Sequence, residues 1–189
     1  MRWLGSGAAA VVLALASAAS ADPGGGELEP GVLAEVNRVR EHPVQYADEL
    51  AAAGSQTPTT REAIAWLEGR EPAPPLEPTP ALASSADLHA LDEGQHGAFE
   101  HTGTDGSSAG QRMRRAGVWA GMLAEEMAAG PATPREVVRQ LIVDEDVPGR
   151  GHRKDLMDPL LRRAGVGCAA HPVYGEICVI DLASAPPPR

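Results

Sequence analysis

The chain has 189 residues, a formal net charge of −10 and only six aromatic residues. Its acidic balance argues against nucleic acid and anionic lipid headgroups as partners, because Lys and Arg make those contacts. With so few aromatic side chains, the core has to be built from Leu, Val, Ile and Ala, and the length suits one domain.

The N-terminus has the three parts of a secretory signal peptide. Arg2 supplies the positive charge, Ala8 to Ala19 form a short apolar segment, and Ala19-Ser20-Ala21 is an A-x-A cleavage site. The apolar segment is too short for a membrane anchor, which needs ~20 apolar residues. We therefore expect residues 1–21 to be a signal peptide. The protein that remains, starting at Asp22, is expected to be secreted (extracellular or periplasmic), without a transmembrane segment, and monomeric.

Three short helices are predicted in residues 22–70, after a disordered start at residues 22–27. The first has apolar residues at helical spacing and ends before Pro43; these residues are Val32, Leu33, Val36 and Val39. The other two are expected around residues 44–50 and over residues 61–68, where Gly69 ends the third. A proline-rich connector, Glu71 to Pro78, separates this helical segment from the main domain, which we place at residues 76–183.

Three capping patterns predict where the central helices begin. Thr79-Pro80 supplies an N-cap and a first-turn proline for a helix that runs to about Gly94. Ser108 and Gln111 form a capping box, and Gly117 ends that helix. Thr133-Pro134-Arg135-Glu136 combines the cap, the proline and the box, and so predicts a third helix start.

A β-hairpin is predicted near the C-terminus. Val166–Ala169 and Ile177–Leu182 are rich in β-branched residues and flank a turn region. Cys168 and Cys178 lie symmetrically about that turn, so export would allow them to form a cross-strand disulfide. Two buried free thiols are the alternative. Central helices followed by strands predict a mixed α and β domain, with a disordered tail at residues 184–189.

A carboxylate falls on the apolar face of the helix that begins at Pro134. Steps of seven from Val138 and four from Leu141 both lead to Glu145. A charge on a core-facing stripe needs a partner or a water-filled pocket, because an unpaired buried charge is costly. Glu145 is therefore a candidate functional residue. The alternative is that the helix ends earlier and leaves Glu145 exposed.

His152 is a second candidate. It follows Gly149-Arg150-Gly151 and is predicted to open a short helix that ends before Pro159. A helix N-terminus favours the neutral imidazole, the form that binds metal or accepts a proton. A lone histidine is more often structural, however. The chain contains no H-E-x-x-H pair, G-x-S-x-G elbow or glycine-rich phosphate loop.

Taken in order, several segments between about Leu76 and Leu182 resemble the successive motifs of the CAP superfamily, which comprises the cysteine-rich secretory proteins, antigen 5 and the pathogenesis-related proteins. The segments are His101-Thr102-Gly103, Ala124 to Ala128, Leu141 to Glu145, Gly149 to Arg153, Ala164 to Cys168 and Val173-Tyr174-Gly175. The sequence departs from the family at two places. The usual Gly-Glu-Asn reads Ala124-Glu125-Glu126, and Ile142 replaces a common Trp.

The resemblance implies an α+β fold, an α-β-α sandwich with a central antiparallel sheet. It also implies a cleft in which His101, Glu125, Glu145 and His152 converge. Some members of the family bind a divalent cation, often zinc, through the two histidines, so His101 and His152 are the expected metal ligands. A lipid or another small ligand is the expected partner. We therefore expect a binding module rather than an enzyme. A metal-assisted hydrolase and a purely structural tetrad are the alternatives, and the role of Glu126 stays open.

Overall fold

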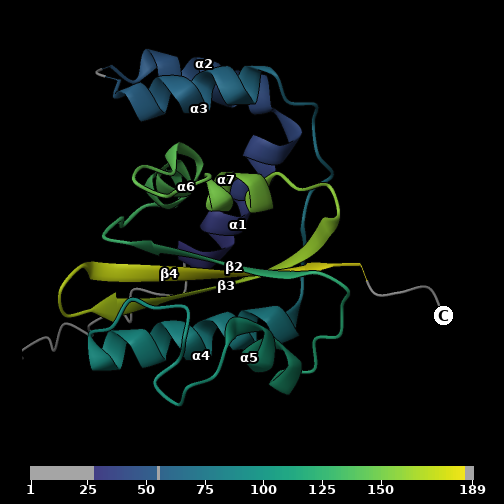
Figure 1. Ribbon diagram of the computed structural model, residues 1–189, viewed down its shortest axis with the longest axis vertical. Coiled ribbons are helices and arrows are strands. Elements are labelled where there is room, and N and C mark those ends of the chain that lie inside the picture. The colour runs from purple at the N-terminus through teal and green to yellow at the C-terminus, as the bar shows by residue number, and fades with distance from the viewer. Residues whose placement is uncertain (1–27, 55, 186–189) are drawn as a thin grey trace, which may run out of the picture.

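The computed structural model describes residues 28–54 and 56–185 of the chain (Figure 1). The expected signal peptide, the expected disordered start at residues 22–27 and residues 186–189 of the expected tail lie outside these ranges. Ser184, which the sequence places in the tail, is the last residue of a β-strand.

The N-terminal segment forms three helices, as predicted: α1 (Leu28–Glu41), α2 (Pro43–Ala52) and α3 (Pro58–Glu68). The apolar face of α1 is buried against two elements of the main domain, β3 (Leu161–His171) and α6 (Pro134–Val143). The helical segment therefore shares one hydrophobic core with the rest of the chain, although a proline-rich connector follows it.

A buried arginine fixes that connector. The Arg40 guanidinium is fully buried and donates hydrogen bonds to backbone carbonyls of Pro74 (2.8 Å), Asp158 (3.1 Å) and Leu161 (2.9 Å). Burial, with a contribution from Arg162, lowers the pKa of Arg40 to about 10. The side chain therefore stays charged at neutral pH while it joins the end of α1 to the start of the C-terminal hairpin.

Four helices remain, and the first three of them begin where their caps predict. They are α4 (Pro80–His96), α5 (Ala109–Arg115), α6 (Pro134–Val143) and α7 (Gly151–Leu156). Thr79 and Thr133 each accept a hydrogen bond from an amide of the first turn, and Ser108 forms a complete capping box with Gln111. Helix α4 continues two residues beyond Gly94 and ends at Gly97, which has a φ of 66°.

The sheet has four strands in the order β1-β3-β4-β2. They are β1 (Glu77–Pro78), β2 (Leu123–Ala129), β3 (Leu161–His171) and β4 (Gly175–Ser184). β4 pairs antiparallel with both β2 and β3. β3 and β4 form the predicted hairpin, which is longer than expected. The two-residue β1 pairs parallel with β3, so the sheet is mixed rather than purely antiparallel.

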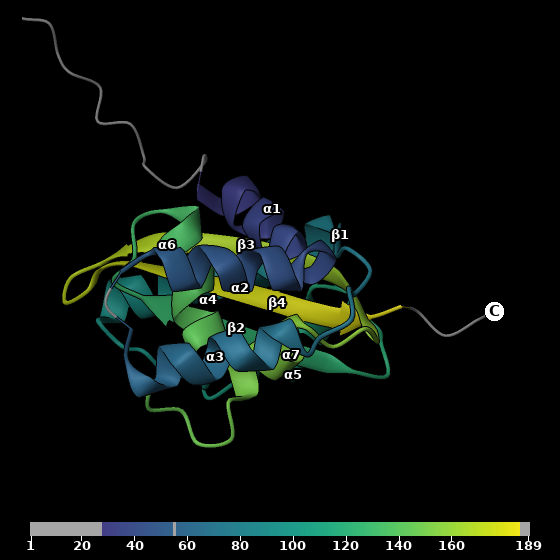
Figure 2. The same ribbon diagram turned by 90° about the horizontal axis from the view of Figure 1, so that it is seen from above.

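Helices cover both faces of the sheet (Figure 1). α4 and α5 pack on one face, α1, α6 and α7 lie on the other, and α2 and α3 form an outer layer (Figures 1 and 2). This arrangement confirms the α+β sandwich class. In the part of the chain that the structure describes, no helix is both long enough and apolar enough to cross a membrane.

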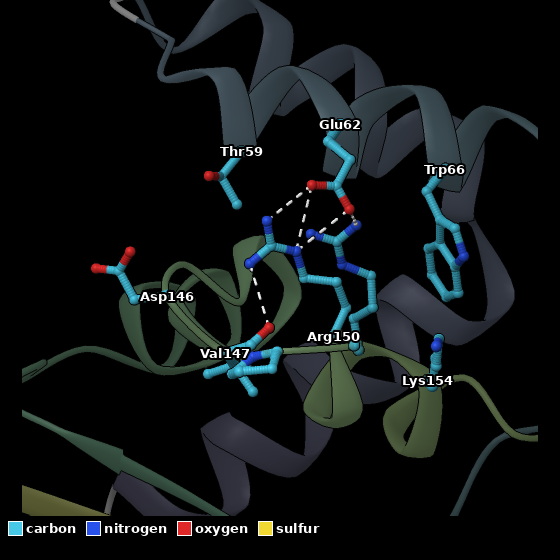
Figure 3. Close-up of a pocket in the computed structure, with 10 residues that line it drawn as sticks. Thr59, Glu62, Trp66, Asp146, Val147, Arg150 and Lys154 are labelled. Carbon is cyan, nitrogen blue, oxygen red and sulfur yellow. Dashed lines mark hydrogen bonds and ion pairs between the residues drawn. The ribbon is translucent and has the colours of Figure 1, made fainter.

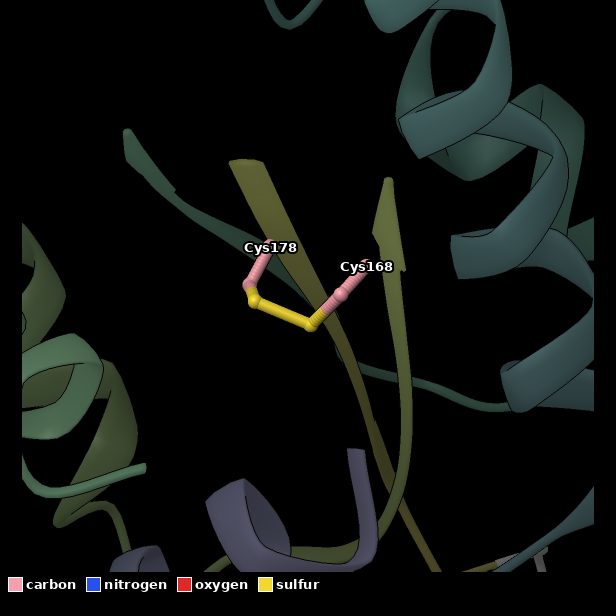
Figure 4. The surroundings of a disulfide bond; sticks show 2 residues. All are labelled: Cys168 and Cys178. Atoms are coloured by element: carbon pink, nitrogen blue, oxygen red, sulfur yellow. A yellow bond between two sulfur atoms is a disulfide. The ribbon is translucent and has the colours of Figure 1, made fainter. Parts of the chain in front are cut away.

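The two cysteines form a disulfide. Cys168 of β3 and Cys178 of β4 lie directly opposite each other in the strand register, and the bond joins them across the hairpin (Figure 4). Both are buried in the main core. The alternative of two free thiols is therefore wrong.

Three glycines let helix α4 lie directly on the sheet. A Cβ atom at Gly165 would overlap the backbone of Leu82 and Ala83, and one at Gly167 would overlap the backbone of Ala86 and Asp87. On the helix itself, a Cβ at Gly94 would collide with the carbonyl of Ala170 in β3. No larger residue fits at these positions unless the helix moves away from the strand.

We expect Gly165→Ala to destabilise the protein by about 3 kcal/mol or to prevent folding, because the added methyl group meets backbone that cannot rotate away. Gly121→Ala is the matched control, since a Cβ there meets nothing within 4 Å. Guanidinium chloride unfolding followed by circular dichroism measures both. Equal effects of the two substitutions would contradict the close-packing argument.

Replacing both cysteines by Ala should lower the free energy of unfolding by at most about 3 kcal/mol, because the closed loop is short and the cross-link removes little chain entropy from the unfolded state. The same unfolding assay applies, and alkylation of the native protein under non-reducing conditions checks the starting state. Two alkylatable thiols in the native protein would overturn the pairing.

Candidate functional site

Two consecutive carboxylates on β2 organise the candidate site. Successive side chains of a strand point to opposite faces, so Glu125 faces α4 and α5 whereas Glu126 faces α6 and α7. β2 pairs with β4 along its whole length, and its other edge has no partner strand among the described residues. Leu123–Ala129 was not predicted as a strand, because its Ala, Glu and Met residues favour helix.

Glu125 holds His101 and Arg112. Its Oε1 lies 2.9 Å from Nδ1 of His101, and its Oε2 accepts a hydrogen bond of 2.6 Å from Arg112. Burial acts to raise the pKa of Glu125, but the hydrogen bonds from His101 and Arg112 outweigh it and leave the pKa below its usual value. The hydrogen bond to Glu125 raises the pKa of His101, whose side chain is 57% exposed. Glu125 is therefore a charged, buried anchor for an accessible imidazole.

A second buried acid lies beside Glu125. Asp181 of β4 is directly opposite Glu125 in the strand register and is fully buried. Neither of its oxygens has a hydrogen-bond partner within the described residues, and burial raises its pKa to about 8. Asp181 is therefore protonated at neutral pH, which avoids two adjacent buried negative charges.

On the opposite face, Asp144 holds His152. Its Oδ1 lies 2.8 Å from Nδ1 of His152, and its Oδ2 accepts a hydrogen bond of 3.3 Å from the amide of Arg153. Asp144 is 1% exposed and caps the C-terminus of α6 with left-handed backbone angles (φ 59°, ψ 42°). Asp tolerates this conformation better than most residues. The carboxylate therefore joins the end of α6 to the N-terminal amides of α7.

The helix-phase argument for Glu145 is wrong, because α6 ends at Val143. Glu145 lies one residue beyond the cap and is exposed, although it lines the same cavity as Asp144 and His152. The residue that contacts His152 is its neighbour Asp144. A left-handed Asp cap in place of the common Gly gives little warning in the sequence that the helix has ended.

The loop between α6 and α7 is held from outside by Glu62 of α3. Glu62 accepts hydrogen bonds from Arg150 (2.9 Å, Figure 3) and from Arg153 (3.3 Å). Arg150 also donates to the carbonyl of Asp144 at 2.7 Å. Arg153 is buried and donates to the last carbonyls of α6. These contacts fix the backbone that positions Asp144 and His152.

Glu126 lies next to His152. Its Oε2 is 3.9 Å from Nε2 of His152, and its side chain is almost completely buried. Burial, reinforced by Asp155 and Asp144, raises the pKa of Glu126 to about 9. The extra carboxyl that departs from the family pattern therefore faces the His152 side of the sheet.

The expected tetrad is thus divided between the two faces of β2. His101 and Glu125 line a cavity of about 590 Å³, whereas His152, Asp144 and Glu145 line another of about 690 Å³. Each histidine keeps its own carboxylate partner. Each imidazole turns Nδ1 toward its carboxylate.

A third group was missed in the sequence. His89, Asp92 and Glu93 of α4 each offer a ligand atom, and these atoms lie within 4.8 Å of one another, so the group could hold a metal ion. His89 and Glu93 are buried, and Asp92 is partly exposed. The i, i+3, i+4 spacing on one helix face is the signal that could have identified it.

The fold is an α+β sandwich in which two consecutive carboxyl residues of the edge strand β2 each approach a histidine on their own side of the sheet. Residues 33–182 match the CAP, or cysteine-rich secretory protein, family, and the chain belongs to it. A search of curated protein sequences gives no significant match.

Three solved structures are similar. An extracellular SCP-domain protein from Bacillus anthracis has a TM-score of 0.52 and 21% identity, over 70% of this chain and 45% of that protein. An outer surface protein from Borrelia burgdorferi has a TM-score of 0.49 and 20% identity, over 58% and 78%. A cysteine-rich secretory protein from Staphylococcus aureus has a TM-score of 0.49 and 13% identity, over 83% and 40%. The chain thus spans less than half of the first and third proteins.

The buried Asp181 should make stability depend on pH. An unfolded Asp titrates near ~3.9, and folding raises this pKa to about 8, so the folded protein binds the extra proton between these values. Asp181 should therefore make the free energy of unfolding fall as pH rises from about 4 to 8, by up to ~1.4 kcal/mol per pH unit, in addition to the similar contribution of Glu126, whose pKa is raised to about 9. Asp181→Asn should reduce the total slope by this amount, and the exposed Asp48→Asn should leave it unchanged. Denaturant titrations of metal-free protein test this, and an unchanged slope in Asp181→Asn would contradict it.

Proposed function

We propose that this protein is an exported CAP-domain binding module that takes a divalent cation, preferentially zinc, at the open edge of β2. The ligands are the Nε2 atoms of His101 and His152. One observation carries the proposal: both imidazoles are anchored at Nδ1 by a buried carboxylate, at 2.9 Å and 2.8 Å. Histidines that bind metal usually have such an anchor, which fixes the tautomer and leaves Nε2 free for the ion.

In this proposal, Asp144 anchors His152 and Glu125 anchors His101, while Glu145, which was expected in the tetrad, anchors neither histidine. Two imidazoles leave the shell of a four-coordinate zinc incomplete, so water fills the other positions. Glu126, 3.9 Å from Nε2 of His152, is close enough to contact such a water.

Export is supported by the signal-peptide pattern in the sequence and by the extracellular SCP-domain protein that shares the fold. The cavity beside His152, about 690 Å³, has the size of a small-molecule site, so the small ligand is placed there.

A metal-assisted hydrolase is the second candidate, and Glu126 is the observation that favours it. Because burial raises the pKa of this carboxyl to about 9, it could act as a general base on a metal-bound water only if the nearby cation drew off its proton. Incubation of the zinc-loaded protein with a peptide library, alongside Glu126→Gln, tests this candidate. Cleavage by the wild type that is lost in Glu126→Gln would favour the hydrolase, and no cleavage would leave the binding module.

The anchoring role of Asp144 can be measured directly. Asp144→Asn keeps the left-handed cap but removes the charge that orients His152, so zinc affinity should fall about tenfold. Glu145→Gln is the matched control on the adjacent exposed residue and should leave affinity unchanged. Isothermal titration with zinc measures both variants.

The zinc affinity should also fall as pH drops from about 8 to 5.5, because protons compete with zinc for the imidazoles.

A larger effect of Glu145→Gln than of Asp144→Asn on zinc affinity would refute the assignment of Asp144 as the residue that anchors His152. Binding that survives the loss of both His101 and His152 at full stoichiometry would refute the metal site at the β2 edge.

A further inference from the structure

Helix α4 carries its own group of metal-ligating side chains. His89, Asp92 and Glu93 lie on one face of the helix, and their ligand atoms are within 4.8 Å of one another. None of them belongs to the site proposed at the β2 edge, although Nε2 of His89 approaches Glu125 to 3.9 Å.

The surroundings of His89 fix its tautomer. Nε2 lies 3.0 Å from the carbonyl oxygen of Glu100, which can only accept, so Nε2 carries the proton. In the neutral ring, Nδ1 then presents a lone pair. His89 is 1% exposed, and Nδ1 has no hydrogen-bond partner within the described residues.

Glu93 presents a second unpartnered acceptor. Its Oε2 accepts a hydrogen bond of 2.6 Å from the amide of Glu100, while Oε1 is buried without a partner. The backbone of Glu100 thus orients both side chains. Two buried acceptors with no donor between them are costly, and a cation removes that cost.

Asp92 completes the group and is held from the other side. It accepts hydrogen bonds from the amide (2.8 Å) and the hydroxyl (2.5 Å) of Thr104. A cavity of about 470 Å³ is lined by both His89 and Asp92, which gives an ion a path from solvent.

We propose that His89, Asp92 and Glu93 form a second divalent-cation site with one nitrogen and two oxygen ligands. Nδ1 of His89 and Oε1 of Glu93 are the buried ligands, and Asp92 is the outer one. This donor set suits a first-row transition ion of the zinc class, because imidazole favours such ions and calcium takes six to eight oxygens.

The experiment uses the full mature chain carrying His101→Ala and His152→Ala, so that binding at the β2 edge is removed. Equilibrium dialysis against zinc should still show about one bound ion per chain. Adding Glu93→Gln should lower this affinity roughly tenfold or more, since a direct ligand matters at least as much as an anchoring residue. Glu100→Gln is the matched control, because only the backbone of Glu100 takes part. His42→Ala is a second control, for an exposed imidazole away from α4.

Absence of zinc from the doubly substituted background, or unchanged affinity in Glu93→Gln, would overturn the α4 site. Nδ1 of His89 and Oε1 of Glu93 would then share a proton rather than a metal ion. If Glu93→Gln fails to fold by circular dichroism, Asp92→Asn serves instead, because Asp92 is partly exposed. The two sites can be refuted separately. If the chain with His101→Ala and His152→Ala binds as much zinc as the wild type, the site at the β2 edge is refuted. If that chain binds no zinc while the single variant Glu93→Gln still does, the α4 site is refuted.

Discussion

The close contact between helix α4 and strand β3 determines where the buried polar groups of the protein lie. Gly165 and Gly167 let the helix backbone rest on the strand, with no side chain between them. At that distance, Ser85 and His89 of α4 reach the layer occupied by Glu125 and Asp181. A bulkier residue on β3 would lift the helix and separate those groups. The contact is therefore a packing constraint with a chemical consequence, since it sets the spacing of the network around Glu125.

The face of the sheet covered by α4 is also where most of the buried polar atoms without a hydrogen-bond partner lie. Within the described residues, six of the eight buried side-chain atoms without a hydrogen-bond partner lie there, on Ser85, His89, Glu93, Arg112 and Asp181. Most buried polar groups in folded proteins are paired, so such a concentration calls for water, protons or ions. The opposite face is better satisfied: Asp144, Arg150 and Arg153 bond to one another's backbone or to Glu62. A bound cation would therefore compensate more unpaired buried polar atoms on the α4 face than on the opposite face.

Local signals in the sequence identified the helices and the hairpin, because threonine and serine caps and the cysteine pair act over a few residues. These local signals failed where tertiary contacts determine the secondary structure of a segment or the role of a residue. Leu123–Ala129 has helix-favouring residues, yet pairing with β4 makes it a strand. The left-handed cap at Asp144 ends α6 at Val143, two residues before Glu145, so the predicted apolar stripe does not reach Glu145. His101 and Glu125 had no local signal, and only the order of motifs selected them. The His89 group does have a signal in its i, i+3, i+4 spacing, but the burial of His89 and Glu93, which makes the group notable, is visible only in the structure.

The adjacency of Glu125 and Glu126 on an edge strand also limits how the chain can change in evolution. A shift of one residue in the β2–β4 pairing would move every side chain of β2 to the other face. Glu126 would then face Arg112 and His101, and Glu125 would face His152, so both networks would lose their partners together. The loops on either side of β2 can absorb insertions, but the strand itself cannot gain or lose a single residue. Length variation among related sequences should therefore fall outside Leu123–Ala129.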